Sequence, residues 1–553
     1  MQDCPFRHST KPARATGAHG KPMPRTRFLA HFAFMSMAVL LAGCATLGLS
    51  PQSASPEAQA QAARSRIQAA NAALQGGHAD AALKQLAGLP SSLPPDVQRQ
   101  ALDVEARAQL ASGNRLAAAR ALARRAPLLP APAQPAVHQR IVAILAGMGN
   151  DSLTALYPTL AGNDPLKPYV SQALAHGGVA TPQALPQLNE PVGTLTSSAV
   201  PQGFVMPAHV ALLLPATGPV AVASAAVRDG FFTAYFHTPA VQEQRPSIKV
   251  YDTGGTADGA LAAYRQAVSD GASLVVGPLS RGAVGALFSQ ASLPVPVLAL
   301  NHAEGNQSVP ANSAEFALLP EAEGAQLAAH MVTAGLHAAI VFRGGDDTTQ
   351  RAFTAFKVEF ESLGGKVAND IVLQPGAVDF QGQIQAALAG PGGETGIVAL
   401  LRPTQARLLL PQLRLARSTL PVFSTSMVYS GDENATADND LDGLQFCDEP
   451  WLYDAQAGLP NHATLASQLS TAGGPAARLF AFGMDAYALM PYLGWLRSHP
   501  GSYLAGATGQ LTMDAFGHVQ RTPIWVQFQG GVARPVAAGL EAQPATAAPP
   551  TGP

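Results

Sequence analysis

Cysteine is scarce in this chain, which has three among its 553 residues: Cys4, Cys44 and Cys447. The first two lie in or directly after an N-terminal segment that we expect to be processed. Once Cys4 is removed with that segment and Cys44 is modified, Cys447 is the single free thiol. An intramolecular disulfide is then excluded, and so is a cysteine cluster for zinc binding or redox chemistry.

Signatures of catalysis are also absent. The sequence has no G-x-S-x-G nucleophile elbow, no H-E-x-x-H and no G-x-x-x-x-G-K-[ST] phosphate loop. The acidic segments "RGGDD" (343–347) and "DENATADND" (432–440) lack the spacing of a calcium loop, so we interpret both as solvated loops. We therefore expect a protein that is not an enzyme and that uses no cofactor and no metal.

A long apolar run is missing too, because the best one, residues 28–43, is too short for a confident membrane span. With Arg25 and Arg27 before it, this run has the layout of a secretory signal. Leu41-Ala42-Gly43-Cys44 resembles the lipobox of bacterial lipoproteins, whose cysteine becomes the acylated N-terminus. The alternative is a plain signal with an incidental cysteine. Ala45, in place of Asp, resembles the outer-membrane sorting signal.

A basic surface is not expected either. The first 43 residues carry a net charge of +5, so their removal lowers the formal charge of the chain from −2 to −7. This balance argues against nucleic acid as a partner. Because residues 1–22 fit no part of the signal, we expect translation to begin at Met23.

What is present first is a helical repeat. Residues 56–160 are rich in Ala, Leu, Arg and Gln, which favour helices. Two segments align at an offset of 36 residues, which places Gly77 opposite Gly113, and a weaker third copy places Gly149 a further 36 along. Each glycine is expected where one helix ends and the next begins. The pattern resembles tetratricopeptide repeats (TPR), and an Ala-rich bundle is the alternative.

The composition of the next segment, rich in Pro, Gly, Ser and Thr, indicates a linker. After it, short apolar strands alternate with helices. This alternation predicts parallel sheets covered on both faces, in two units joined near residues 312–320, with a cleft between two lobes. The predicted strands are 209–215, 248–253, 273–278 and 296–300, then 338–342, 366–373, 396–401 and 420–425. The predicted helices are 220–236, 257–269, 280–290, 321–333, 348–362, 379–389 and 404–416.

Ligands of such sheets bind at the carboxyl ends of the strands. Ser280 and Arg281 open a helix, where free N–H groups favour an anion; an ordinary N-cap serine beside a surface arginine is the alternative. Asp485 reads as a capping or hinge residue more than as a catalytic acid. The candidate cleft residues are Thr217, Gly218, Ser280, Arg281, Asn301, Ser424, Tyr429 and Asp485.

Specific stretches then resemble type I periplasmic binding proteins: "ALLLPATGPVAVASAAVRDGFFTA", "VVGPLSRGAV", "PVPVLALN" and "FGMDAYAL". The resemblance implies that the last of these returns the chain to the first lobe as a helix. It also implies a closing hairpin with the pattern G-x-x-G-x-[LIV]-x-[FM]-D-x-x-G, which Gly506, Gly509, Asp514 and Gly517 match.

Lipobox, helical repeats and binding-protein fold, in this order, resemble the penicillin-binding protein activator family LpoA. The resemblance implies an outer-membrane lipoprotein facing the periplasm that binds a class A penicillin-binding protein and stimulates peptidoglycan transpeptidation. It implies two further partners, outer-membrane lipid through acylated Cys44 and, as a candidate, peptidoglycan. The helical region, with about three repeats, looks shorter than in better-known members. No docking residues can be carried over.

The predicted fold class is α + α/β, with N-terminal TPR-like helical repeats followed by a two-lobed α/β domain like type I periplasmic binding proteins. A solute-binding lipoprotein that delivers amino acids to a transporter is the alternative function, although such a receptor needs no helical repeats. A cell-wall hydrolase is a third, which no residues suggest. The predicted segments are a leader and signal (1–43), an anchor and tether (44–55), the helical domain (56–180), the linker (181–208), the two-lobed domain (209–535) and a disordered tail (536–553).

Overall fold

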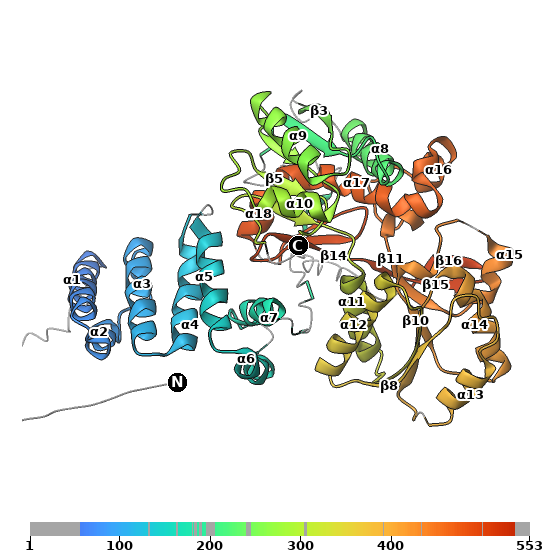
Figure 1. Cartoon of the computed structure of the whole chain (residues 1–553), viewed down its shortest axis with the longest axis horizontal. Helices are drawn as coiled ribbons and strands as arrows, with labels where there is room; N and C mark the ends of the chain where they lie inside the picture. Colours follow the sequence, from blue (N-terminus) through green and yellow to red (C-terminus); the bar gives the residue numbers. More distant parts are fainter. Residues whose placement is uncertain are drawn as a thin grey trace, which may run out of the picture. The chain divides into compact units, whose positions relative to one another are not determined.

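The computed structural model describes most of the chain after residue 55 (Figure 1). The predicted signal, Cys44 with its tether, and the tail beyond Val536 lie outside the described residues. The described ranges are 56–130, 133–161, 164–177, 179, 181, 185–186, 191–194, 205–238, 245–303, 307–390, 392–432, 434–499 and 501–536.

Paired helices form the N-terminal domain, as the repeat predicts. The three glycines spaced by 36 residues each lie at the turn within a pair, with φ of 79° at Gly77, 77° at Gly113 and 84° at Gly149. This left-handed conformation is cheapest for glycine, which explains why the glycines carry the repeat. The helices are α1 (Pro56–Gln75), α2 (Ala79–Leu86), α3 (Pro95–Ala111), α4 (Arg115–Arg125), α5 (Gln134–Ala146), α6 (Asn150–Leu156) and α7 (Lys167–His176).

Small side chains fill much of the helical core. Ala106, Ala119 and Ala121 are fully buried beside Leu122 and Ile141, so neighbouring helices can approach closely. At the start of α4, the Asn114 side chain accepts a hydrogen bond from the Ala117 N–H at 3.1 Å, an ordinary N-cap.

The first lobe is built on a nine-stranded sheet with the order β1-β12-β13-β14-β6-β5-β4-β2-β3. Strand β1 comes from within the predicted linker and pairs in parallel with β12. The strands are β1 (Pro191–Thr194), β2 (His209–Leu214), β3 (Ser247–Asp252), β4 (Leu274–Val276), β5 (Val297–Ala299), β6 (Ala314–Phe316), β12 (Tyr503–Ala505), β13 (Gln510–Met513) and β14 (His518–Thr522). The helices are α8 (Ala221–His237), α9 (Ala257–Ser269), α10 (Arg281–Phe288), α16 (His462–Gln468), α17 (Ala477–Leu489) and α18 (Leu493–Ser498).

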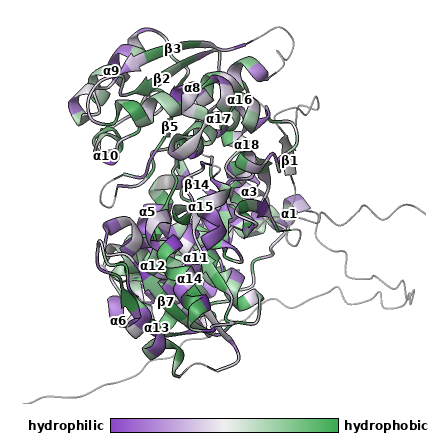
Figure 2. Cartoon of the chain, turned by 90° about the vertical axis from the view of Figure 1, so that its right-hand side faces the viewer, coloured by the Kyte–Doolittle hydropathy of each residue, from purple (hydrophilic) through white to green (hydrophobic). Residues whose placement is uncertain are grey.

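The second lobe has a seven-stranded sheet with the order β16-β15-β11-β10-β9-β7-β8. Strands β7 and β9 are almost entirely buried, and the hydrophobic colouring of Figure 2 follows β7. The strands are β7 (Ala338–Arg343), β8 (Lys366–Val372), β9 (Thr395–Leu400), β10 (Val422–Ser424), β11 (Gln445–Asp448), β15 (Ile524–Gln529) and β16 (Val532–Pro535). The helices are α11 (Pro320–Thr333), α12 (Asp347–Ser362), α13 (Gln381–Leu388), α14 (Pro403–Leu415) and the short α15 (Ala435–Asp438).

Among the described elements the chain crosses between the lobes three times: from β6 to α11, from β11 to α17, and from β14 to β15. The second crossing returns the chain to the first lobe as a helix, as the resemblance implies. Helix α17 packs on α8 with almost no space between the backbones. A Cβ added at Gly230 would lie 1.9 Å from the Phe480 oxygen, and one at Gly483 would lie 2.0 Å from the Val227 oxygen.

Two charged residues of the acidic segments are buried, where solvated loops were predicted. Arg343, at the end of β7, is 9% exposed and pairs with Asp370, and Asp438 is 1% exposed and pairs with Arg407 at 2.7 Å. The prediction of solvated loops was therefore wrong for these residues, because each charge has a partner distant in sequence. Over the described ranges, no group of three His, Cys, Asp or Glu side chains is arranged to hold a metal ion. Within the same ranges, no helix combines the length and hydrophobicity that crossing a membrane requires.

Candidate functional site

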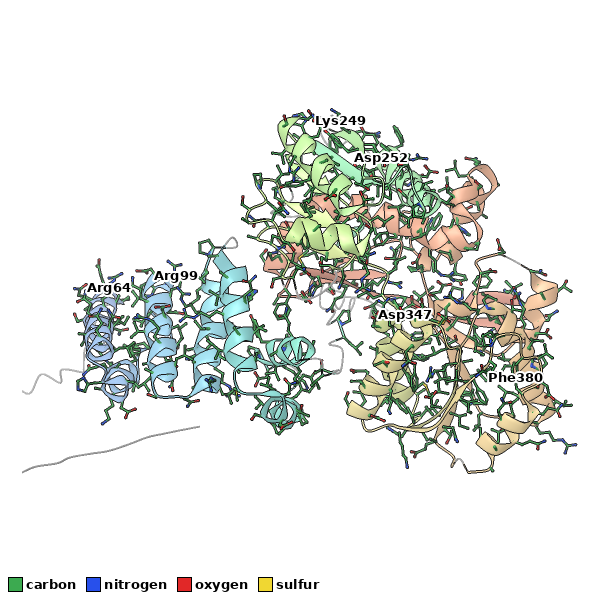
Figure 3. All side chains as sticks on the ribbon, in the orientation of Figure 1. Arg64, Arg99, Lys249, Asp252, Asp347 and Phe380 are labelled. Carbon is green, nitrogen blue, oxygen red and sulfur yellow. The ribbon has the colours of Figure 1, made fainter. Side chains whose placement is uncertain are left out.

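Apart from Asp485, the predicted cleft residues of the first lobe lie just after β2, β4 and β5. Asp252, labelled in Figure 3 at the end of β3, accepts hydrogen bonds from the Ala216 N–H at 2.8 Å and the Thr217 hydroxyl at 2.9 Å. It also accepts from the Gly254 N–H at 2.8 Å. Together these bonds, led by that of Gly254, lower the pKa of Asp252. A carboxylate of the chain itself thus occupies donors that an anionic ligand would need.

Gly218 lies directly against this cluster with φ of 88°, and a Cβ there would be 3.0 Å from the Gly254 oxygen. Ser280 is the N-cap residue of α10, but its hydroxyl donates to the Gly255 oxygen at 3.3 Å and does not cap the helix. Arg281 follows it and is exposed. The Asn301 amide donates to the Leu279 oxygen at 2.9 Å and accepts from the next N–H, so it holds a turn.

The three other predicted residues make internal contacts. Ser424 is fully buried, and its hydroxyl donates to the Ala399 oxygen at 2.6 Å. The Tyr429 ring packs edge-on against Phe528 at 5.5 Å. Asp485 is fully buried and accepts hydrogen bonds from the backbone at the entry to the closing hairpin.

The closing hairpin depends on two carboxylates, of which Asp485 is fully buried and Asp514 is partly exposed. Asp485 accepts from the Ala507 N–H at 2.6 Å and from the Thr508 N–H at 2.7 Å, and burial raises its pKa to about 6. Gly506 is required beside it, because a Cβ would lie 2.6 Å from the Asp485 carboxylate. At the hairpin tip, Asp514 accepts from the N–H groups of Phe516 and His518, each at 2.9 Å.

A buried ion cluster between the lobes was not predicted from the sequence. Glu323, on α11, accepts from the Ser426 N–H at 3.1 Å and hydroxyl at 2.7 Å, and its other oxygen accepts from Arg521 of β14. Arg521 also lies 3.7 Å from Glu449, whose pKa burial raises well above its usual value. Arg521 and Glu323 are 198 residues apart, so no local pattern could reveal the pair.

A second buried pair fixes the crossing from β11 to α17. Arg478 donates to both carboxylate oxygens of Asp448, at 2.8 and 2.7 Å, and to the backbone oxygen of Tyr429 at 3.0 Å. The Tyr453 hydroxyl donates to the same carboxylate at 2.7 Å. Bidentate pairs of this kind are directional, so they fix orientation as well as distance.

The hairpin tip also contacts the helical domain. The Phe516 ring lies edge-on to His138 of α5 at 6.0 Å and to Tyr169 of α7 at 5.2 Å. Below it, the His518 ring bonds Asp514 at 3.0 Å and stacks on His302 at 5.1 Å. Burial lowers the pKa of both imidazoles. For His518 the attraction of the Asp514 carboxylate is larger than this effect and raises the pKa of His518 to about 9. His302 stays neutral, with its pKa lowered to about 3 by burial and by charged His518.

This architecture defines the class: a two-lobed fold of the type I periplasmic-binding-protein kind, preceded by helical repeats. The family model described as "LppC putative lipoprotein" matches residues 202–531, more than half of the chain. The chain belongs to this family of lipoproteins, which confirms the resemblance to the LpoA activators.

Individual relatives of this chain carry the name LpoA. A penicillin-binding protein activator LpoA from Edwardsiella piscicida is 29% identical over 336 residues, which cover 54% of this chain and 48% of that protein. The solved structure of LpoA from Haemophilus influenzae, in a monoclinic form, is 22% identical and covers 86% of this chain and 88% of that one. Its TM-score of 0.51 indicates a shared fold. The LpoA C-domain from the same organism, described as a regulator of PBP1A, is 26% identical, with coverage of 59% and 99% and a TM-score of 0.51. The chain spans about half the length of the curated relatives it matches.

Proposed function

We propose that this protein is an outer-membrane lipoprotein that binds a class A penicillin-binding protein and stimulates its transpeptidase activity. The family, and the names of relatives that are activators, support the proposal. Acylation of Cys44 would anchor the chain in the inner leaflet of the outer membrane, so that the helical repeats and the lobes face the periplasm. Peptidoglycan itself is a further candidate partner.

The single structural observation that carries this proposal is the buried charge that joins the lobes. Solute-binding receptors of this fold need lobes that close on a ligand, and closure requires a hinge that moves. Here Arg521 of the first sheet and Glu323 on α11 form an ion pair with side chains only 4% and 8% exposed. A relative movement that separated them would leave two charges buried without partners. Lobes joined in this way favour a scaffold over a receptor.

The hydrogen bonds at the carboxyl ends of β2 and β3 also favour a scaffold over a solute receptor. Donors that would bind a ligand carboxylate, the Ala216 N–H and the Thr217 hydroxyl, are already bound to Asp252. A ligand would have to displace this internal carboxylate. On a scaffold the activity comes from contact with a partner, and the partner must bind more tightly in its active state than in its inactive state.

A reconstituted cross-linking assay tests the proposal. The chain from residue 45 onward retains every described residue, and it is added to the cognate class A synthase with lipid-linked substrate. We expect a larger fraction of cross-linked peptides, whereas the chain alone should give no product. Unchanged cross-linking, together with no detectable binding to the synthase, would exclude the activator role.

Calorimetry against a panel of amino acids tests the solute-binding alternative. Because Glu323 and Arg521 join the lobes and Asp252 occupies the donors after β2, we expect no amino acid to bind with micromolar affinity at the carboxyl ends of the first-lobe strands. A micromolar amino-acid ligand whose affinity falls on Ser280→Ala would favour a transport receptor, because Ser280 is the half-exposed hydroxyl at that edge.

A further inference from the structure

The charge of this chain is unevenly distributed between its domains. Residues 56–180 carry a net charge of +4, whereas residues 209–535 carry a net charge of −9. Of the seven acids in the helical domain, four are in ion pairs with arginines. The other three, Glu57, Asp80 and Asp151, lie in the first turn of a helix, where the helix dipole stabilises a negative charge. The surplus charge of the helical domain is therefore positive.

Arginines of the first two helix pairs make the same kind of contact. Arg66, in the middle of α1, donates to the Ala87 oxygen just after α2. Arg99 of α3 donates to the Leu128 oxygen, shortly after α4, at 2.9 Å. Helices α1 and α3 lie side by side, as the labels of Arg64 and Arg99 show in Figure 3. Each pair thus holds an arginine of its first helix over the end of its second helix, on the same side of the stack.

Further cations surround these two arginines. The last turn of α2 adds Lys84, and the last turn of α4 adds Arg124 and Arg125. We call Arg66, Lys84, Arg99, Arg124 and Arg125 the basic edge. Arg124 and Arg125 pair with acids of α3, but over the described residues no carboxylate lies within the 4.0 Å of an ion pair from Arg66, Lys84 or Arg99. Because guanidinium groups match the geometry of phosphates, this edge attracts phosphate groups.

A groove of about 530 Å³ lies between the ends of α2 and α4. Its apolar lining includes Leu83, Leu89, Leu102 and Leu128. Arg124 and Glu105, paired at 2.7 Å, also line it. The residues whose oxygens bond Arg66 and Arg99 line the groove too, so both guanidinium groups lie beside it. Leucines next to guanidinium groups suit an amphiphile with an apolar chain and an anionic head.

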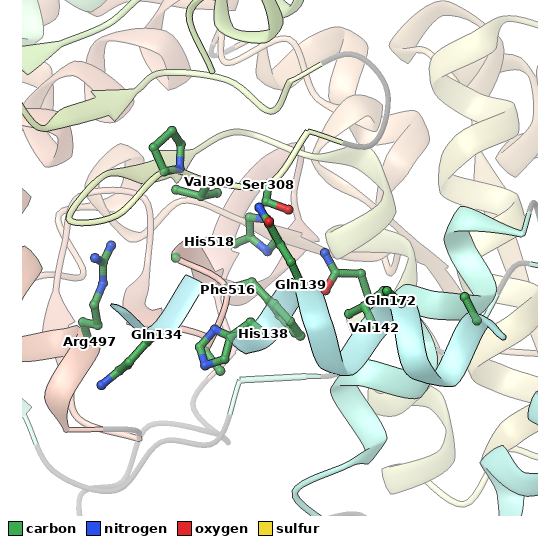
Figure 4. Close-up of a pocket in the computed structure, with 15 residues that line it drawn as sticks. Gln134, His138, Gln139, Val142, Gln172, Ser308, Val309, Arg497, Phe516 and His518 are labelled. Carbon is green, nitrogen blue, oxygen red and sulfur yellow. The ribbon is translucent and has the colours of Figure 1, made fainter. Parts of the chain in front are cut away.

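The third helix pair is not part of this edge. Its first helix, α5, meets the first lobe at the pocket drawn in Figure 4, where Gln134 and His138 of α5 and Arg497 of the lobe are among the lining residues. The Phe516 ring of the hairpin tip packs on the same helix. The first lobe therefore occupies this part of the helical domain, and the basic edge is confined to α1–α4.

The predicted anchor indicates the source of an anionic amphiphile. Because the two helices of a pair run antiparallel, α1 begins on the side where α2 ends, which is the side of the basic edge. Pro56 opens α1 only 12 residues after Cys44, so the chain between them spans at most about 40 Å. A lipid on Cys44 would therefore hold the basic edge close to a membrane surface.

We propose that the basic edge binds anionic phospholipid of the membrane that holds the anchor. The arginines pair with headgroup phosphates, and the leucine groove takes the apolar part of one lipid. The same negative surface repels the negatively charged lobes, which orients them away from the membrane. The identity of the membrane rests on the proposed function, but binding of lipid to the edge needs neither Cys44 nor the synthase.

Vesicle sedimentation tests this surface with the chain from residue 45 onward, which carries no lipid of its own. We expect binding to vesicles of phosphatidylethanolamine with phosphatidylglycerol, and binding at least about tenfold weaker to phosphatidylcholine vesicles, because basic residues are attracted to an anionic surface. Salt at about 0.5 M should abolish the binding, since the Debye length then falls to roughly 4 Å.

Paired variants locate the surface. Lys84→Gln combined with Arg124→Gln removes two exposed cations of the basic edge and should weaken vesicle binding by about tenfold or more. Lys366→Gln combined with Arg265→Gln is the matched control, because it removes the same charge from exposed positions of the lobes and should change nothing. Circular dichroism checks that each variant keeps its helical content.

Calorimetry with short-chain lipid tests the groove. Dihexanoyl phosphatidylglycerol should bind saturably, whereas glycerol 3-phosphate, which has the phosphate without the acyl chains, should give no detectable binding. Leu102→Gln should weaken binding of the lipid by about tenfold, because Leu102 lines the groove and belongs to neither hydrophobic core of the helical domain.

Equal binding to both kinds of vesicle, an equal loss in the lobe control, or unchanged lipid affinity of Leu102→Gln would overturn the inference. Sedimentation with purified peptidoglycan in place of vesicles would overturn it too, and would assign the edge to the cell wall. Absent stimulation of cross-linking with intact lipid binding would count against the proposed function alone. The two failures are therefore distinguishable.

Discussion

The ion pair between Glu323 and Arg521 predicts a large effect from a small change. Glu323→Gln keeps the shape of the side chain and removes its charge. Breaking a buried pair by removing one partner costs roughly 3–5 kcal/mol, because the other charge stays buried. The new amide can still accept from Ser426, and Glu449 remains 3.7 Å from the arginine. We therefore expect the lower end, a loss of about 3 kcal/mol in the free energy of unfolding.

Urea unfolding followed by tryptophan fluorescence measures this loss cleanly. The three tryptophans, Trp451, Trp495 and Trp525, all lie in the two-lobed domain, so the signal does not report on the helical repeats. Glu361→Gln is the matched control, because Glu361 pairs with Lys357 on the surface of α12 at 4.0 Å with both side chains half exposed. Exposed pairs contribute about 0–1 kcal/mol. If Glu323→Gln costs no more than this control, the lobes are not held by the ion pair.

A double variant separates charge from packing. Glu323→Gln combined with Arg521→Met removes both charges, and Glu449 can stay protonated because burial raises its pKa. The loss should be smaller than the sum of the two single losses, since each single change leaves an unmatched charge. Additive losses would mean that the two side chains act independently.

Three further changes test the closing hairpin. His518→Gln should lower the free energy of unfolding by about 2 kcal/mol at pH 6, because Asp514 raises the pKa of His518 to about 9. This loss should disappear as the pH rises through 9, and a loss that stays constant over that range would mean that His518 is not charged in the folded protein. Phe516→Ala should lower amide-exchange protection in α5 and α7 and leave the tryptophan unfolding midpoint nearly unchanged, because the ring packs on those helices. Gly509→Ala should lower the free energy of unfolding by more than about 1 kcal/mol, because Gly509 has φ of 140° and the new Cβ would lie 2.3 Å from the Thr522 backbone oxygen. Gly382→Ala is the control: Gly382 lies in α13 with no atom within 4 Å of an added Cβ, so this change should be neutral or stabilising.

The sequence predicted the fold well wherever the signal is local. Strands buried on both faces are continuous apolar runs, so β2 and β7 were found within one or two residues. The glycines spaced by 36 residues located the helical turns. Strands β1 and β11 were missed, because each has only four residues and pairs with a strand distant in sequence. Strands β15 and β16 were missed too, although they form a hairpin with each other.

The site was less accessible to sequence analysis because its partners are far apart. Thr217 was selected at the end of β2, but its carboxylate partner Asp252 lies 35 residues further on. Arg521 looked like the last residue of a hairpin, and nothing near it indicated a pair with Glu323. Phe516 occupied an unspecified position of the closing motif, so its contact with the helical domain could not be foreseen.

The closing strand has a mechanical consequence. Only Pro523 separates β14 from β15, so residues 518–529 run from the first sheet directly into the second. At about 3.3 Å per residue, this ribbon is about 40 Å long. It starts two residues after Phe516, the contact with the helical repeats. A force applied to the helical domain would therefore be transmitted through this extended segment to the second lobe, because no loop lies between β14 and β15.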